Sequence, residues 1–216
     1  MKVGVLGTGG VGQTIRTKLI ELGHDVTMGS RTPDNEAAAE WVQASGGSAS
    51  QGTFAEAAAA SETLFNCTAG AASLEALEAA GRENLAGKLL IDLANPLDFS
   101  AGMPPTLTVC NDDSLGEQIQ GAFPQARVVK TLNTVNAAVM TAPGQLSEPT
   151  TVFIAGNDEA AKAEAVQLLE SFGWPRDSVL DLGDISAARG MEMYLPIWLR
   201  MMGALGTPAF NVRAVR

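Results

Sequence analysis

The chain has 216 residues, of which 46% are hydrophobic, and its mean hydropathy of +0.10 is typical of a globular protein with a substantial core. Its formal net charge of −10 disfavours nucleic acid and anionic membranes as partners, because an acidic surface attracts neither. The two cysteines are too few for a disulfide scaffold and the first expected strand begins at residue 2, so we expect a cytoplasmic protein without a signal peptide.

The chain opens with the pattern of a strand, a glycine-rich turn, a helix and a second strand. An apolar strand runs into Gly7, Gly9 and Gly12, and a helix over 13–22 and a strand over 25–29 follow. In this context the glycines predict a dinucleotide site, because they allow a tight turn, approach of a diphosphate and close helix packing. We expect the following residues to bind the diphosphate at the positive end of the helix: Gly7, Thr8, Gly9, Gly10, Val11 and Gly12.

The residues after the second strand favour NADP over NAD. An NAD site places an acidic residue about 20 residues past the glycines, where it binds the ribose 2′-hydroxyl. Here Ser30, Arg31 and Thr32 stand at that point, and their hydroxyls and guanidinium can donate hydrogen bonds to a phosphate. Asp34 and Glu36 are rival carboxylates, but we expect them in the first turn of the next helix, with Thr32 as its N-cap.

Short apolar strands alternate with helices along the rest of the chain, which predicts an α/β fold of the Rossmann type with a doubly wound parallel sheet. The expected elements are helix 37–44, a strand near 48, a capping-box helix from 53, strand 63–68, helix 74–80, strand 88–94, loop 96–111, a capping-box helix from 114, and strand 127–131. We expect residues 1–148 to form an NADP-binding domain and residues 149–216 a short C-terminal α/β extension that closes the cleft.

The expected extension contains strand 151–155, helix 158–171, strand 178–181 and a last helical element from about residue 186. An apolar stripe runs along this last element at steps of three and four residues: Met191, Leu195, Trp198, Met202 and Leu205. We expect the stripe to pack on the core rather than to form a cofactor wall. Charged residues and a proline interrupt it, so no membrane span is predicted.

Ligands of open α/β sheets bind at the carboxyl ends of the strands, near the point where the strand order reverses. On this rule we place the nicotinamide and its redox partner beside two sets of loop residues: Thr68, Ala69, Gly70, Asn95 and Pro96 for the nicotinamide, and Asn133, Asn136 and the tail 205–211 for the acceptor.

No side chain is expected to act as acid, base or nucleophile, and no metal site is expected. The single histidine, His24, precedes the second strand, far from the nicotinamide, and Lys88 and Lys130 lie within expected strands. Cys67 ends a buried strand, where a cysteine is usually inert packing. The cofactors are therefore expected to carry the redox chemistry.

Short motifs spread over the whole chain resemble one family. They are Val5–Gly12, Gly29–Arg31, Val128–Asn133, Gly156–Asp158, Leu182–Asp184, Ala188–Arg189 with Glu192, and Phe210–Asn211. In this order they resemble the NADPH-dependent oxidoreductases of coenzyme F-420, a deazaflavin, and the related N-terminal domain of the STEAP metalloreductases. The resemblance implies a Rossmann-type sheet with added strands, a homodimer, and a 2′-phosphate held by Thr8, Ser30 and Arg31.

The chain departs from the deazaflavin enzymes at two places. Residues 32–36 bring no further basic residue, and Asn133–Asn136 stands in place of a histidine-containing segment, which is closer to the metalloreductase pattern. We therefore expect an NADP-dependent oxidoreductase that passes hydride between NADPH and a deazaflavin, with FMN or FAD as the alternative acceptor. A non-catalytic NADPH sensor, and a reductase of a small carbonyl or imine with a proton donor near Thr68, remain as alternatives.

Overall fold

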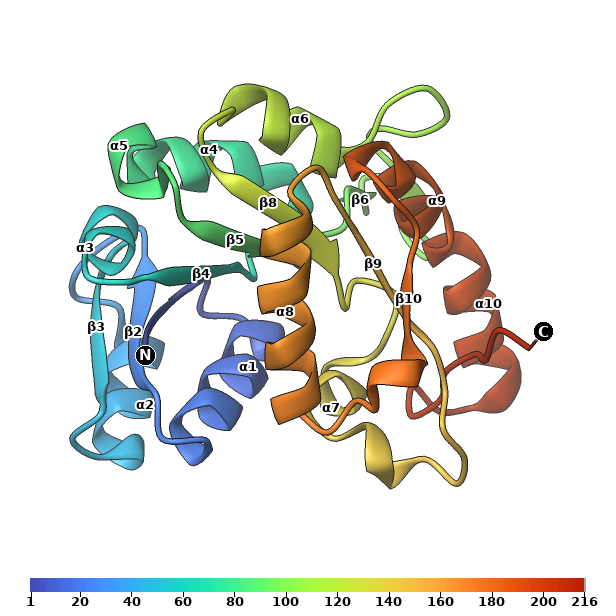
Figure 1. Ribbon diagram of the computed structural model, residues 1–216, viewed down its shortest axis with the longest axis horizontal. Coiled ribbons are helices and arrows are strands. Elements are labelled where there is room, and N and C mark those ends of the chain that lie inside the picture. The colour runs from blue at the N-terminus through green and yellow to red at the C-terminus, as the bar shows by residue number, and fades with distance from the viewer. Residues whose placement is uncertain (216) are drawn as a thin grey trace.

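An eight-stranded sheet forms the centre of the computed structural model, which describes residues 1–215 (Figure 1). The strand order is β10-β9-β8-β5-β4-β1-β2-β3, so the chain winds from β1 to β3 on one side and from β4 to β10 on the other. The strands are β1 (Lys2–Leu6), β2 (Asp25–Ser30), β3 (Ala49–Thr53), β4 (Thr63–Asn66), β5 (Leu89–Asp92), β8 (Arg127–Thr131), β9 (Val152–Gly156) and β10 (Val179–Asp181). This order confirms the predicted doubly wound α/β fold.

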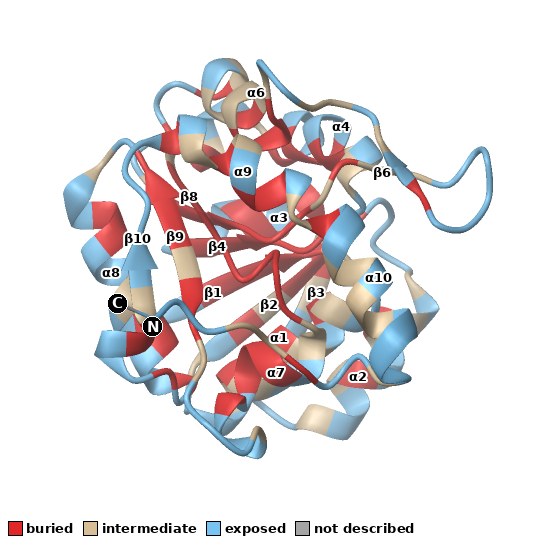
Figure 2. Ribbon diagram, turned by 90° about the vertical axis from the view of Figure 1, so that its right-hand side faces the viewer, coloured by how far each residue is buried: buried red, intermediate tan, exposed pale blue. Residues whose placement is uncertain are grey.

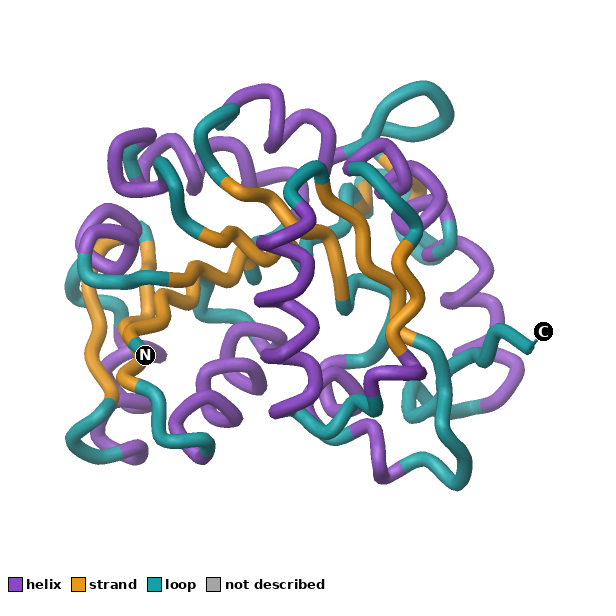
Figure 3. The backbone as a smooth tube through the Cα atoms, viewed as in Figure 1, coloured by secondary structure: helices purple, strands orange, loops and turns teal. Residues whose placement is uncertain are grey.

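Helices cover both faces of the sheet (Figure 3). One face carries α1 (Gly10–Glu21), α2 (Glu36–Ser45), α7 (Ala137–Thr141) and α8 (Glu159–Ser171). The other carries α3 (Phe54–Ala59), α4 (Gly70–Ala80), α5 (Arg82–Leu85), α6 (Leu115–Ala122) and α9 (Ala188–Met193). The last helix is α10 (Leu195–Leu205), and three short 3-10 turns are η1 (Pro143–Gln145), η2 (Arg176–Ser178) and η3 (Ile185–Ala187).

Two strands, β9 and β10, break the parallel arrangement that we predicted, because they run opposite to the other six. Strand β9 runs antiparallel to β8, with Val129 opposite Gly156, whereas the other strand pairs of the sheet within residues 1–215 are parallel. Strand direction leaves no mark on the apolar pattern of a buried strand, because both faces are covered in either case. Strands β9 and β10, which lie in the expected C-terminal extension, continue the same sheet.

The inner strands are buried on both faces, which explains their continuous apolar sequences (Figure 2). Two apolar clusters fill the space between sheet and helices, one on each face. Phe65 stacks on Phe172 of the segment after α8 with ring centroids 6.2 Å apart in the first cluster. The long exposed loop that we expected over 96–111 contains a small hairpin, β6 (Leu97–Asp98) with β7 (Thr106–Leu107).

The predicted helix starts are partly right. Thr53 caps α3 in the predicted capping box, with reciprocal bonds to Glu56. Ser114 caps α6, but Glu117 bonds the Ser114 hydroxyl rather than its backbone N–H. Thr32 does not cap α2: Asn35 does, through a bond from the Ala38 N–H, so the N-cap lies three residues later than expected, because an asparagine side chain was available closer to the apolar stretch.

The apolar stripe of the last element is divided between two helices. Met191 of α9 and Leu195 at the start of α10 are buried, but Trp198 and Met202 are half-buried and Leu205 is 59% exposed. Figure 2 accordingly shows most of α10 as intermediate or exposed. The expectation that the whole stripe packs on the core was therefore wrong, because α10 lies away from the sheet and contacts chiefly α9.

Candidate functional site

A cavity of about 780 Å³ lies at the carboxyl ends of β1, β2 and β4, at the point where the strand order reverses. It brings together eight of the predicted site residues: Gly7, Thr8, Gly9, Ser30, Arg31, Thr32, Thr68 and Ala69. The rest of its wall comes from Asn35, Thr53, Phe54, Cys67 and four residues of α4, namely Ala72, Glu75, Ala76 and Ala79. The glycine turn with the end of β2 and the segment from Cys67 into α4 are far apart in sequence, and they thus line one cavity.

The glycine turn has the shape that a bound diphosphate needs. Gly7 has φ +115°, and a Cβ there would lie 2.7 Å from the carbonyl oxygen of Cys67. A Cβ on Gly12 would lie 2.3 Å from the Gly7 carbonyl oxygen, so this glycine lets α1 pack on the strand. Around Gly9 and Gly10, in contrast, no atom lies within 4 Å of such a Cβ, so the turn presents open backbone.

The start of α1 adds unsatisfied donors to this open backbone. No side chain caps the helix, and its first turn holds no acidic residue. The first N–H groups of a helix have no partner within it and carry partial positive charge, which favours an anion. The turn can therefore accept an anion, and the predicted diphosphate would meet the backbone rather than the side chains of Gly10, Val11 and Gly12.

The end of β2 gives the cavity its second anion-binding feature. Ser30 is buried and donates a hydrogen bond from Oγ to the carbonyl of Thr32 at 2.5 Å, which holds the turn that displays Arg31. Arg31 is exposed, and no ion pair engages it within residues 1–215. Among the lining residues Glu75 of α4 is the one acid, so no carboxylate from the β2 turn repels a phosphate here.

The remaining predicted residues hold loops in place instead of lining the cavity. The side-chain amide of Asn95 donates to the Asn133 carbonyl at 2.8 Å, and Asn133 Nδ2 donates to Asn95 Oδ1 at 2.9 Å. Gly70 lets α4 approach this pair, since a Cβ there would meet the Asn95 carbonyl oxygen at 2.0 Å, and Pro96 follows directly. Asn136 caps α7 by accepting from the Ala138 N–H.

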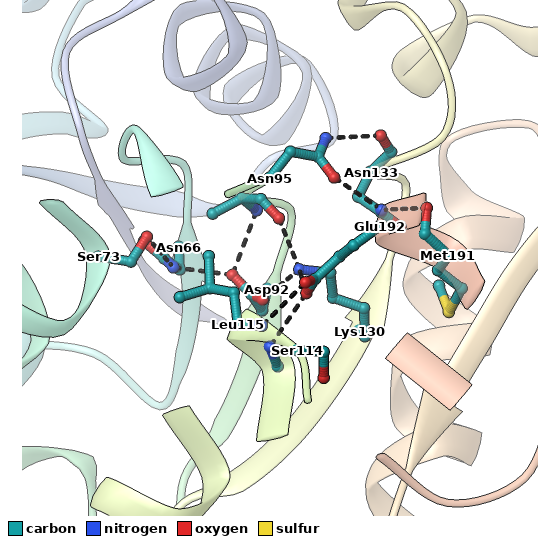
Figure 4. Close-up of polar contacts among 12 residues, drawn as sticks. Asn66, Ser73, Asp92, Asn95, Ser114, Leu115, Lys130, Asn133, Met191 and Glu192 are labelled. Atoms are coloured by element: carbon teal, nitrogen blue, oxygen red, sulfur yellow. Dashed lines mark hydrogen bonds and ion pairs between the residues drawn. The ribbon is translucent and has the colours of Figure 1, made fainter. Parts of the chain in front are cut away.

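A buried polar network that the sequence did not predict joins Asn66, Ser73 and Asp92 (Figure 4), and Thr68 bonds to it from the cavity wall. Asn66 Nδ2 donates to Asp92 Oδ1 at 2.8 Å and to Ser73 Oγ at 3.1 Å. Thr68 Oγ1 donates to Asn66 Oδ1 at 2.7 Å and lies 2.9 Å from Ser73 Oγ. The hydroxyl at the cavity wall is therefore oriented by an amide and a second hydroxyl, neither of which titrates near neutral pH.

Lys130 continues this network into the centre of the molecule (Figure 4). Its Nζ lies 2.7 Å from Asp92 Oδ2 and 2.8 Å from Glu192 Oε1 of α9, and all three side chains are buried. Glu192 also accepts hydrogen bonds from the N–H groups of Leu115 and Gly116 at the start of α6. Burial alone would lower the pKa of Lys130, but the two carboxylates outweigh it and raise the pKa above 10.5.

A sequence signal for this cluster existed. Asp92 ends the apolar strand β5 and Lys130 interrupts β8, and a charged residue in a buried strand needs a partner. The pattern does not say which partner, because the contact with Glu192 spans 62 residues of chain.

Other residues considered for chemistry lie in unreactive surroundings. Burial raises the pKa of Cys67 well above its usual range, so its thiol stays neutral. His24 lies before β2, at the opposite edge of the sheet from the cavity. Within residues 1–215 no cluster of His, Cys, Asp and Glu side chains is arranged to hold a metal ion. No helix in that range has the length and apolar content needed to cross a bilayer.

Comparison with known proteins adds three findings. Residues 2–96 match the family described as "NADP oxidoreductase coenzyme F420-dependent". A crystal structure of a candidate F420-dependent NADP-reductase from Arthrobacter sp. FB24 is 53% identical, with complete coverage of both chains and a TM-score of 0.95. The metalloreductase STEAP3 of Rattus norvegicus is 28% identical over 91% of this chain, which spans 38% of that protein's length.

More distant structures share the fold. A reductive aminase from Aspergillus terreus, solved with NADPH and ethyl levulinate, is 22% identical and has a TM-score of 0.67. The match covers 95% of this chain and 62% of that one.

Proposed function

The chain belongs to the family of coenzyme F420-dependent NADP oxidoreductases, and on that basis we propose that its cavity binds NADPH and serves hydride transfer to a deazaflavin or flavin. In this proposal the diphosphate lies on the open backbone from Gly7 to Gly12, including Val11. The 2′-phosphate lies against Arg31, with the hydroxyls of Thr8 and Thr32 as further donors, while Ser30, whose proton goes to the Thr32 carbonyl, holds the turn.

One observation supports this proposal most directly. The cavity joins an uncapped helix start to an exposed arginine that has no carboxylate partner within residues 1–215, in a protein with net charge −10. An acidic protein attracts a multiply charged anion only where local donors outweigh the overall charge. A guanidinium next to two hydroxyls at this place favours a phosphate ester over a free ribose hydroxyl.

The nicotinamide is assigned to the Thr68 end of the cavity. When bound, NADPH supplies the hydride and the acceptor ring takes it up. The protein's part is alignment: the network through Asn66 fixes the Thr68 loop, and the amide pair of Asn95 and Asn133 fixes the two loops beyond it. The acceptor would stack beside Asn133–Asn136 and the tail 205–211, with residues 149–216 closing the cleft.

We also propose a homodimer. Helix α10 turns apolar side chains to solvent, with Ile197 56% and Leu205 59% exposed, and it packs mainly on α9. An apolar helix face left uncovered by its own chain is typical of a subunit interface. Sedimentation at several concentrations tests this, and Ile197→Glu should shift the protein toward monomer. A monomer at all concentrations would contradict the proposal.

Two experiments test the activity itself. Calorimetric titration with NADPH and with NADH measures whether the cavity binds the dinucleotide and which one it prefers. Stopped-flow mixing of the NADPH complex with coenzyme F420, FMN or FAD then follows absorbance at about 340 nm, where oxidation of the nicotinamide is seen.

The outcomes separate the alternatives. Tight binding without oxidation by any of these acceptors would favour the sensor. Turnover with cyclic imines or ketones alone would favour the carbonyl or imine reductase, which nothing at Thr68 supports, because its side-chain partners cannot donate a proton near neutral pH.

A further inference from the structure

The second turn of α1 carries a buried arginine that the proposed function does not use. Arg16 is 1% exposed and belongs to the layer between α1, α2 and β2. Its guanidinium carbon lies 4.7 Å from the ring centroid of Trp41, and NH1 contacts the sulfur of Met28. Neither neighbour carries a charge, and Nε has no hydrogen-bond partner.

A buried cation without a counter-ion is costly, and proteins rarely keep one without a use. No ion pair engages Arg16 among residues 1–215, whereas the other fully buried cation, Lys130, has two carboxylates. Burial lowers the pKa of Arg16 to about 10, so the group remains protonated at neutral pH. The protein therefore holds an uncompensated positive charge in its interior.

Arg16 lies on α1, the helix whose N-cap Gly9 lines the cavity. Helical side chains lean toward the N-terminus of their helix, and Arg16 starts about 9 Å along the axis from Gly10. Its charge also acts on Cys67, which forms part of the cavity wall beside Gly7. The guanidinium is buried in the protein, which screens charge far less than water does.

We propose that Arg16 is a positioning residue for the dinucleotide, a buried counter-charge that strengthens binding of the diphosphate from behind the glycine turn without touching it. The inference rests on the proposed function. It differs from the role of Arg31, which would face the 2′-phosphate and select NADPH over NADH. Arg16 would act on the group that both dinucleotides share, and so on both equally.

The test replaces Arg16 with methionine, which has a similar length and no charge. We expect Arg16→Met to weaken NADPH and NADH alike by about tenfold, from a unit charge at about 10 Å in a partly desolvated setting. Thermal unfolding of the ligand-free protein should stay at the wild-type temperature or rise, because an unpaired buried charge is removed. Inorganic pyrophosphate should raise the unfolding temperature of wild type more than that of the variant.

Two matched variants guard against a purely structural effect. Lys18→Met removes a charge from the same helix, but Lys18 is partly exposed and paired with Glu21, so affinity should change less than about twofold. Arg16→Lys keeps a charge, and its affinity should lie nearer to wild type than that of Arg16→Met.

Three results would overturn the inference while leaving the proposed function intact: unchanged affinities in Arg16→Met, affinities lost together with the unfolding temperature, or equal losses in Arg16→Met and Arg16→Lys. Failure of wild-type protein to bind NADPH would overturn both.

Discussion

At the β1–β2 end of the sheet's carboxyl edge, the glycine turn and the start of α1 present backbone donors that the chain itself leaves unsatisfied. At the β4–β5–β8 end, Asn66, Asp92, Lys130 and Glu192 satisfy one another in the interior. The first end has the free groups that a ligand can use, and the second has polar groups already committed to each other. Polar residues at the carboxyl edge of a sheet therefore indicate a binding site only where their donors and acceptors are not already paired within the protein.

The largest expected effect comes from disrupting the buried ion pairs at the β4–β5–β8 end. Lys130→Met leaves the carboxylates of Asp92 and Glu192 buried without their cation, which should lower the free energy of unfolding by about 3–5 kcal/mol. Lys162→Met is the control, because its partners Glu159 and Asp181 are 84% and 48% exposed, and its loss should stay within about 1 kcal/mol. Urea unfolding measures both. A loss in Lys130→Met no larger than the control would show that the cluster contributes little.

The stability that Lys130 contributes should also depend on pH. Since its folded pKa is raised above 10.5, the stability that it contributes is complete below that pH and is lost as the pH rises through the folded value. The difference in stability between wild type and Lys130→Met should therefore shrink in strongly alkaline solution.

The next largest effect is expected at the β1–β2 end, where the donors are unsatisfied. Arg31→Ala should weaken NADPH by about 1.5–3 kcal/mol, or roughly 10- to 150-fold, because a charged hydrogen bond to the phosphate is lost. NADH lacks that phosphate and should bind almost unchanged, and the unfolding temperature should not move because Arg31 is exposed. Calorimetric titration of wild type and Arg31→Ala with NADPH and NADH measures these changes in affinity. Equal losses for the two would refute the placement of the 2′-phosphate.

A smaller effect is expected at the start of α6, which borders the satisfied end. The buried hydroxyl of Ser114 accepts from the Glu117 N–H at 3.2 Å and donates to its carboxylate at 2.7 Å. Ser114→Ala should cost about 1 kcal/mol of unfolding free energy, as loss of a helix cap usually does. Ser48→Ala, at an exposed site before β3, should change it by less than about 0.5 kcal/mol.

The smallest effect concerns the ion pair between α6 and α9. Arg189 lies 2.6 Å from Glu117 and is 38% exposed, so solvent screens the pair and Glu117→Gln should cost less than about 1 kcal/mol at pH 7. The hydrogen bond from Arg189 lowers the pKa of Glu117 below 4.5, so this contribution is present above that pH and disappears as the pH falls through the lowered value. Unfolding midpoints of the two proteins should converge in acid.

Local patterns predicted most of the fold. The glycine turn, the order of strands and helices and the caps at Thr53 and Ser114 all depend on residues close in sequence, and the structure confirms those elements, although the strands expected over 63–68 and 88–94 are shorter. The reversed direction of β9 and β10 and the exposure of α10 were not predicted, because both depend on how distant segments pack. Apolar periodicity reports that a face is buried somewhere, and cannot say against what.

The site residues divide in the same way, into those set by local sequence and those set by the packing of distant segments. Six of the eight predicted residues at the cavity wall come from the glycine turn and the end of β2, where one short crossover fixes the geometry, and the other two, Thr68 and Ala69, follow β4. Asn95 and Asn133 were placed beside the ligand but bond each other, since their pairing depends on two loops that meet only in the folded chain. The role of Asp92 with Lys130 was hidden for the same reason.

The unequal burial of the two cysteines has a practical consequence. Cys67 is buried and held as a neutral thiol, whereas Cys110 is only partly covered and follows the β6–β7 hairpin. A maleimide dye should therefore attach to the native protein at one position without any mutagenesis. That dye would sit on the segment after the hairpin, whose Thr108 N–H bonds the Pro96 carbonyl, so its fluorescence can report movement of this loop.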